Sequence, residues 1–108
     1  MANTFTSYVN KNVGTSAATV VTVGASTQTT IIGLAVANTT ASPITADVYM
    51  TRSAVDYYLI KGATVPVGSS LVVVGADQKV VLITADILKV VTSAASSADV
   101  VTSVLNIT

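Results

Sequence analysis

The sequence predicts an all-β fold, an antiparallel β-sandwich or jelly roll of about eight strands with an extended N-terminal arm. β-Branched residues dominate, since the 108 residues include 20 valines, 17 threonines and seven isoleucines, and such side chains favour strands. No stretch of the chain keeps apolar residues at helical spacing opposite a charged face. Apolar and polar positions alternate instead in short segments, separated by the residues that favour turns.

The length of 108 residues is that of one small domain. Residues 1–18 are predicted to form the arm, because the segment Thr6–Tyr8 and a stretch rich in threonine and serine that begins at Gly14 and ends at Thr19 look flexible in isolation. Residues 19–108 are predicted to form the β-sandwich domain. We expect its strands at residues 19–23, 29–37, 44–51, 56–61, 71–74, 79–83, 87–91 and 100–107, with residues 63–67 as an irregular edge that carries Pro66.

Two of these strands have faces that can be assigned from their alternation. In residues 44–51, Ile44, Ala46, Val48 and Met50 are expected to point inward. In residues 29–37, one face is expected to hold Ile32, Leu34 and Val36, and the other Ile31, Gly33, Ala35 and Ala37.

The connections at residues 75–78 and 84–86 are short, so they are expected to close antiparallel hairpins. Residues 72–74 and 80–81 are all valine, and are therefore apolar on both faces of their strands. A sandwich strand that faces water on one side reads as polar at every second position. We therefore expect another subunit to cover the outer face of these strands.

The composition separates this chain from membrane and nucleic-acid-binding classes. Charged residues make up 9% and hydrophobic residues 51%, whereas soluble domains carry about 25% charged residues. A membrane-spanning helix needs about 20 consecutive apolar residues, and the sequence has no such run. The ten charges are scattered singly and sum to zero, which does not suit binding to a phosphate backbone. No signal peptide is recognisable, so synthesis in the cytoplasm is expected.

Histidine and cysteine are absent, which excludes Ser-His-Asp and Cys-His nucleophilic sites and the commonest transition-metal ligands. Asp77 and Asp86 flank one predicted hairpin, but aspartate is also a favoured turn residue because its side chain bonds nearby backbone. The interpretation is structural: we expect no enzyme activity, no metal and no cofactor.

The aromatic residues are candidate interface residues, because tyrosine is enriched where proteins meet. They are Phe5, Tyr8, Tyr49, Tyr57 and Tyr58. An alternative for the adjacent pair Tyr57 and Tyr58 is that one ring lies in the core and the other packs on a neighbouring strand.

Four stretches resemble small virion structural proteins of tailed bacteriophages, particularly those of marine and cyanobacterial hosts. They are residues 32–40, IGLAVANTT, residues 66–71, PVGSSL, residues 75–82, GADQKVVL, and residues 92–101, TSAASSADVV. The resemblance implies a β-sandwich component of a virion. Its motifs are turns and strands, so it implies no catalytic or ligand-binding residue.

The function expected from these observations is that of a structural subunit of a tailed-phage virion. The preferred interpretation is a capsid decoration (cement) protein, which stabilises the shell through contacts between subunits. A neck, tail or fibre component is the alternative within the particle. Partners would be the major capsid protein or neck and tail subunits, together with further copies of the chain. A host-glycan-binding module is the alternative from another class, and it requires Tyr49, Tyr57 or Tyr58 to form an exposed platform.

Overall fold

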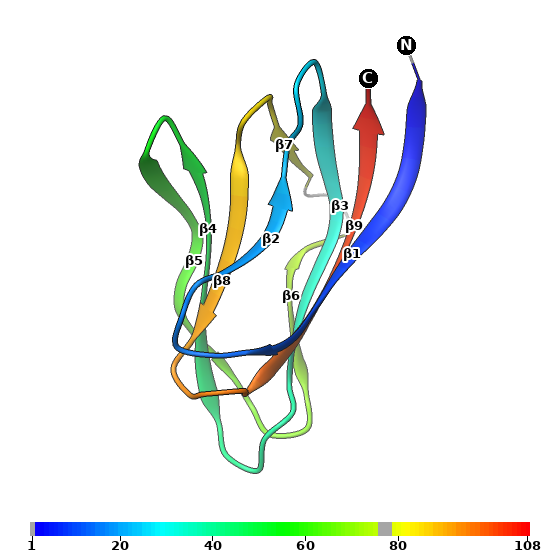
Figure 1. Cartoon of the computed structure of the whole chain (residues 1–108). Coiled ribbons are helices and arrows are strands. Elements are labelled where there is room, and N and C mark those ends of the chain that lie inside the picture. Colours follow the sequence, from blue (N-terminus) through cyan, green and yellow to red (C-terminus); the bar gives the residue numbers. More distant parts are fainter. Residues whose placement is uncertain (1, 76–78) are drawn as a thin grey trace.

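A computed structural model describes residues 2–75 and 79–108, which form two antiparallel sheets packed face to face (Figure 1). The predicted all-β sandwich is confirmed. The strands are β1 (Asn3–Val13), β2 (Ala18–Thr22), β3 (Gln28–Asn38), β4 (Ile44–Arg52), β5 (Val55–Val65), β6 (Ser70–Val74), β7 (Val80–Leu82), β8 (Ile87–Thr92) and β9 (Ala98–Ile107). Within the described residues, no helix is long and apolar enough to cross a membrane.

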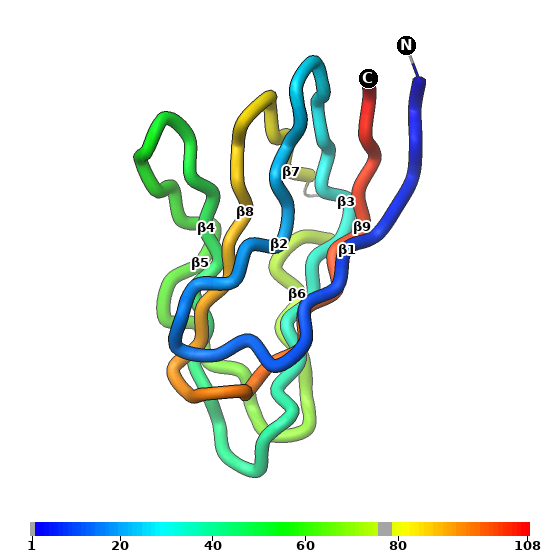
Figure 2. The backbone as a smooth tube through the Cα atoms, viewed as in Figure 1, coloured from blue at the N-terminus to red at the C-terminus, as the bar shows by residue number. Residues whose placement is uncertain are grey.

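The strand order settles the choice between sandwich topologies. Sheet A has the order β1-β9-β3-β6, with β7 also paired to β3, and sheet B has the order β2-β8-β4-β5. The chain can be followed in Figure 2 as a long hairpin that is rolled up: β4 pairs with β5, β3 with β6 and β7, β2 with β8, and β1 with β9. This nested pairing is a jelly roll.

The core lies between the two sheets and consists of aliphatic side chains. Its largest fully buried members include Ile31, Leu34, Leu82 and Leu88. The inward positions predicted for β4 are confirmed for Ile44, Ala46 and Val48, which are buried, and Met50 packs against the core at its margin. Burying aliphatic groups of this size contributes about 1.5–3 kcal/mol each, and this term holds the two sheets together.

The prediction for β3 is wrong at Ile32, because the strand contains a β-bulge. Ile31 pairs with Val104 and Gly33 with Ser103, so Ile32 has no partner of its own on β9. The extra residue reverses the alternation. Ile31 therefore shares the buried face with Leu34, and Ile32 is only partly buried.

Both predicted hairpins are wrong. β6 and β7 do not pair with each other but lie one after the other along β3, each antiparallel to it. β7 and β8 belong to different sheets, and the segment 84–86 crosses between them with Ala85 at a φ of 74°. A short connection permits a hairpin but does not require one. Residues 76–78 of the first connection, including Asp77, lie outside the described residues.

The tight hairpin joins β4 to β5 through Ser53 and Ala54, whose φ angles are 53° and 63°. The expected strand at 56–61 and the irregular edge at 63–67 largely form one long strand, β5. Gly62 makes this possible, because its φ of 68° forms a bulge. The carboxylate of Asp47 accepts the Gly62 N–H at 2.6 Å.

The expected arm, residues 1–18, mostly lies within the body. Residues 3–13 are strand β1, which pairs with β9 of the same chain along most of its length and forms one edge of sheet A. The two ends of the chain lie side by side (Figure 1), because Ala2 and Thr108 exchange two backbone hydrogen bonds of 3.1 and 2.9 Å.

Candidate assembly surface

The outer face of sheet A carries two rows of aligned side chains that cross the sheet from β1 to β6 and β7. The register aligns Val9, Val101, Ala35 and Val72 in one row, which we call the valine row. It aligns Phe5, Leu105, Thr30 and Val81 in a second row, which we call the phenylalanine row. Between them lie Ser7, Ser103 and Gly33.

Five of the eight members of these rows are apolar residues with most of their surface exposed, whereas Thr30, Ala35 and Leu105 are partly buried. Phe5 and Val9 are each 73% exposed, and Val72 is 65% exposed. Val81 and Val101 are 56% and 51% exposed. Single exposed apolar residues are ordinary on a protein surface, but a contiguous set on one face marks a site of interaction.

Charge is distributed unequally between the two sheets. In the strands of sheet A the charged residues are Lys11 and Asp99, which form an ion pair of 2.9 Å at one end of the sheet. The hydrogen bond from Lys11 lowers the pKa of Asp99, and the Asn12 N–H adds to the effect. The strands of sheet B carry Asp47, Arg52, Asp56, Lys61 and Lys89. The two rows of sheet A therefore contain no charged group.

The five aromatic candidates do not share one surface. Phe5 lies in the phenylalanine row of sheet A. Tyr49 and Tyr58 lie together on sheet B, with ring centroids 4.9 Å apart, and the Lys61 ammonium lies 4.4 Å from the Tyr58 ring. Tyr58 is half-exposed, whereas Tyr49 is buried beneath it with 8% of its surface accessible. Burial raises the pKa of Tyr49, and the charge of Asp56 adds to this.

Tyr8 and Tyr57 point elsewhere. Tyr8 packs against the core, and its hydroxyl accepts a hydrogen bond of 3.2 Å from the Asn106 side-chain amide. Tyr57 pairs with Met50 and leaves β5 on the side opposite to Tyr58, since successive side chains alternate. Of the three tyrosines named for a glycan platform, Tyr49 is buried, and Tyr57 and Tyr58 lie on opposite sides of β5.

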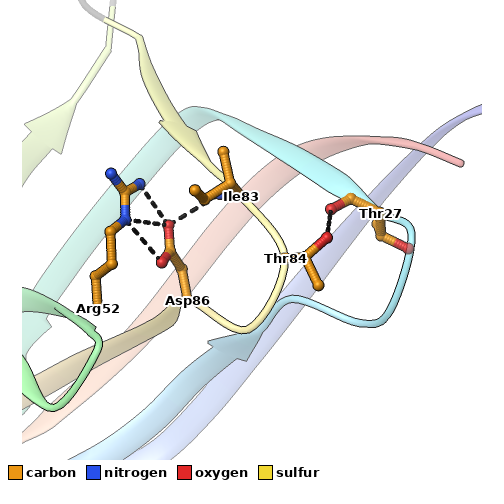
Figure 3. Close-up of polar contacts among 5 residues, drawn as sticks. All are labelled: Thr27, Arg52, Ile83, Thr84 and Asp86. Atoms are coloured by element: carbon orange, nitrogen blue, oxygen red, sulfur yellow. Dashed lines mark hydrogen bonds and ion pairs between the residues drawn. The ribbon is translucent and has the colours of Figure 1, made fainter.

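Asp86 has a structural role (Figure 3). Its carboxylate accepts hydrogen bonds from Arg52, with Nη2–Oδ2 at 2.6 Å and Nε–Oδ1 at 2.9 Å, and from the Ile83 N–H at 2.9 Å. The Thr84 hydroxyl donates to the Thr27 carbonyl at 3.0 Å nearby. Together these bonds fix the crossing from β7 in sheet A to β8 in sheet B. The hydrogen bond from Arg52 is the main reason that the pKa of Asp86 is lowered.

A search of residues 2–75 and 79–108 finds no group of three or more histidine, cysteine, aspartate or glutamate side chains placed to hold a metal ion. A shallow pocket of about 320 Å³ lies between residues 11–18 and Ala95 and Ser96. Its one charged lining residue is Lys11, which is paired with Asp99.

The residues that sequence reasoning missed are the exposed valines Val9 and Val101. Val72 and Val81 were expected to need a cover from outside the chain, and both are exposed here on the outer face of sheet A. The signal for Val9 was present in the alternation of Phe5, Ser7 and Val9. It could be interpreted only once β1 was known to be an edge strand.

Comparison with models of protein families finds no match. Comparison with curated protein sequences also finds no match. A solved structure of similar fold comes from Bacillus endospore appendages, which are described as a novel family of disulfide-linked pili. It has a TM-score of 0.59 at 14% sequence identity, with 99% of this chain and 87% of that chain covered. At this identity the likeness shows a common fold, a small β-sandwich that in the other protein belongs to a pilus.

Proposed function

We propose that this chain is a structural subunit of a larger protein assembly and docks to a neighbouring subunit through the outer face of sheet A. One observation carries the proposal: both rows of this face are uncharged and, apart from Thr30, apolar, while the charges of the strands lie mainly on sheet B. An exposed apolar face of this kind is typical of a surface that a partner covers in the functional assembly.

The dimensions of the face agree with this role. Three strands of 10 or 11 residues and the edge shared by β6 and β7, spaced about 4.8 Å apart and rising about 3.3 Å per residue, span roughly 19 by 33 Å, or about 600 Å². A standard interface buries about 800 Å² on each partner. The outer face of sheet A thus offers about three quarters of the area that one partner of a standard interface buries, and residues at its margins would supply the rest.

The structural neighbour supports an assembly role, because the protein with the similar fold belongs to pili. The means of linkage must differ, since the pili are described as disulfide-linked and this chain has no cysteine. Copies of this chain would associate through packing and backbone hydrogen bonds alone.

For the assembly itself, we propose the virion of a tailed bacteriophage, with the chain as a capsid decoration protein. The support is the resemblance of residues 32–40, 66–71, 75–82 and 92–101 to phage virion proteins, together with the charged fraction of 9%. A decoration protein lies across seams between capsid subunits, and a compact sandwich with one apolar face suits that position. A place in the neck or tail is the alternative within the same particle.

Electron microscopy of the purified chain separates these assemblies. Trimers that bind to phage shells support decoration, and rings of sixfold or twelvefold symmetry support a neck or tail component. Extended filaments would favour a pilus-like polymer over both. A chain that stays single and binds no phage particle would contradict the virion proposal.

The contact surface is tested with two aspartate substitutions. Val101→Asp places a charge at the centre of the valine row, and Val67→Asp places one at a half-exposed valine outside the strands. Both variants should fold, since both positions are open to solvent. We expect Val101→Asp to reduce association and Val67→Asp to leave it unchanged. Equal effects of the two variants would contradict docking through sheet A.

A further inference from the structure

The positions of polar and apolar residues in strand β1 are not explained by packing within its own domain. Its even-numbered residues face the core side, and these are Thr4, Thr6, Tyr8 and Asn10, of which only Tyr8 and Asn10 are partly buried. Its most exposed large apolar residues, Phe5 and Val9, face outward. The chain therefore gains little from burying β1 side chains before Val13. The apolar residues of this strand are placed for a contact outside the domain.

The free edge of β1 is also the least protected of the sheet edges that the structure describes. β5 carries Asp56, Lys61 and the bulge at Gly62. β2 has five residues and a shift in register, and the opposite edge of sheet A is divided between β6 and β7. By contrast, the first eight residues of β1 include no charge and no proline. Charges, bulges, prolines and short strands are the means by which proteins keep edges from pairing.

The backbone N–H and C=O groups of β1 that point to the free edge of the sheet belong to the residues whose side chains lie on its outer face. Ala2 exchanges both hydrogen bonds with Thr108, and antiparallel strands alternate between bonded and non-bonded pairs. Even-numbered residues up to Asn10 therefore bond to β9. The N–H and C=O groups of Phe5, Ser7 and Val9 point to the free edge.

These three residues make the edge complementary to itself. Ser7 is midway between Phe5 and Val9, so an antiparallel pairing centred on Ser7 places Phe5 of each copy opposite Val9 of the other. An aromatic residue opposite a β-branched one is a favourable cross-strand pair, worth about 0.2–1 kcal/mol. All three pairs are of the hydrogen-bonded kind, and supply about six backbone hydrogen bonds by the regular antiparallel pattern.

We propose that two copies of this chain join through β1, in an antiparallel pairing with Ser7 on the twofold axis. This pairing rests on the proposed role as an assembly subunit. The partner at the edge of β1 is a second copy of the chain. The valine row of one copy then continues into the phenylalanine row of the other. Sheet A becomes one continuous sheet across the pair, and its apolar outer face doubles in width. Among the edges described, β5 equals β1 in length, with 11 residues, but carries Asp56, Lys61 and the bulge at Gly62.

A single cysteine tests the axis, because the chain has no native cysteine. In the proposed pair, two residues at position 7 are directly opposite, with Cβ atoms about 5 Å apart. Under mild oxidation, Ser7→Cys should therefore give a disulfide-linked dimer of two 10.9 kDa chains. The control is Ser103→Cys, which lies on the same face one strand inward and should remain uncrosslinked.

The register is tested by opposite charges in the Ser7→Cys background. Phe5→Lys and Val9→Glu should each reduce crosslinking when alone, since each places a lone charge opposite an apolar side chain. A mixture of the two should regain crosslinking and give the mixed dimer, because lysine then faces glutamate.

The outcomes separate this inference from the proposed function. Oligomers without a Ser7→Cys crosslink, or with equal crosslinking of Ser103→Cys, would overturn pairing through β1 while leaving the assembly role intact. Crosslinking of Ser7→Cys that the mixture does not regain would overturn the register. A chain that stays single in the presence and absence of oxidant would contradict both.

Discussion

The guanidinium of Arg52 donates hydrogen bonds to the carboxylate of Asp86 from both Nε and Nη2, and the shortest contact, Nη2–Oδ2, is 2.6 Å. Arg52 ends β4 in sheet B, and Asp86 ends the segment that enters sheet B from β7. Asp86 is almost fully buried, while the Arg52 side chain is partly exposed. This ion pair and the bond to Ile83 hold the passage between the two sheets.

Asp86→Ala should lower the free energy of unfolding by about 2–3 kcal/mol, because it removes the partner of a charged group and the acceptor of the Ile83 N–H. Chemical denaturation measures the change. Asp56→Ala is the control: Asp56 is exposed and accepts one hydrogen bond, from the Thr51 hydroxyl, so its loss should cost about 0.5 kcal/mol or less. Equal losses would argue against a special role for Asp86.

Stability should fall in acid, partly through Asp86. Its pKa is lowered in the folded chain, mainly by the hydrogen bond from Arg52, so the carboxylate contributes fully above its unfolded pKa of about 3.9. The contribution is lost as the pH falls through the lower folded pKa. The difference in unfolding free energy between the natural chain and Asp86→Asn should therefore be constant near neutral pH and narrow below about pH 4. A difference that widens in acid would contradict this assignment.

Thr102→Val should stabilise the fold by about 1 kcal/mol. The Thr102 hydroxyl is buried and, among the described residues, is the buried side-chain group without a hydrogen-bond partner. Valine has nearly the same shape and removes this unsatisfied group. The matched control is Thr92→Val, because the buried Thr92 hydroxyl bonds the Ala94 carbonyl at 2.9 Å and the Ser97 hydroxyl at 2.7 Å. Thermal unfolding should show opposite changes in the two variants.

Gly14→Ala should lower the free energy of unfolding by about 2 kcal/mol, a cost typical of overpacking. A Cβ at Gly14 would lie 2.9 Å from the Ser96 nitrogen and 3.1 Å from the Ala95 Cα, and both atoms belong to backbone. The control is Gly24→Ala, where the nearest atom is the Thr27 hydroxyl oxygen at 3.7 Å. Denaturation curves that coincide for the two variants would show that this contact relaxes freely.

The sequence was a good guide to the class of fold and to most strands, because β-branched residues and alternation report local structure directly. It was a poor guide where one residue decides between two arrangements. The bulge at Ile32 reverses the faces of β3, and its one signal was the adjacent Gly33, since a lone glycine within a strand is consistent with either a bulge or a close approach of another backbone. The β4–β5 turn uses Ser53 and Ala54 at positive φ, where asparagine and glycine would have given a clear signal.

The candidate surface was only partly predictable, for a related reason. The valine-only segments of β6 and β7 led to the expectation that a second subunit covers their outer face. The place of β1 could not be predicted, because its partner β9 is distant in the chain, with Asn3 paired to Ile107 and Val13 to Ala98, and because its core-facing side is polar. Position in the sheet, which sequence alone does not give, turns Phe5 and Val9 into parts of one apolar face.

The molar mass of the full chain in solution, measured by light scattering over a range of concentrations, tests the assembly role most directly. The natural chain should show a mass that rises with concentration to a multiple of 10.9 kDa, and Val101→Asp should shift this rise to higher concentration. A natural chain that stays at 10.9 kDa throughout and is indistinguishable from Val101→Asp would contradict the proposal that the outer face of sheet A is built for association.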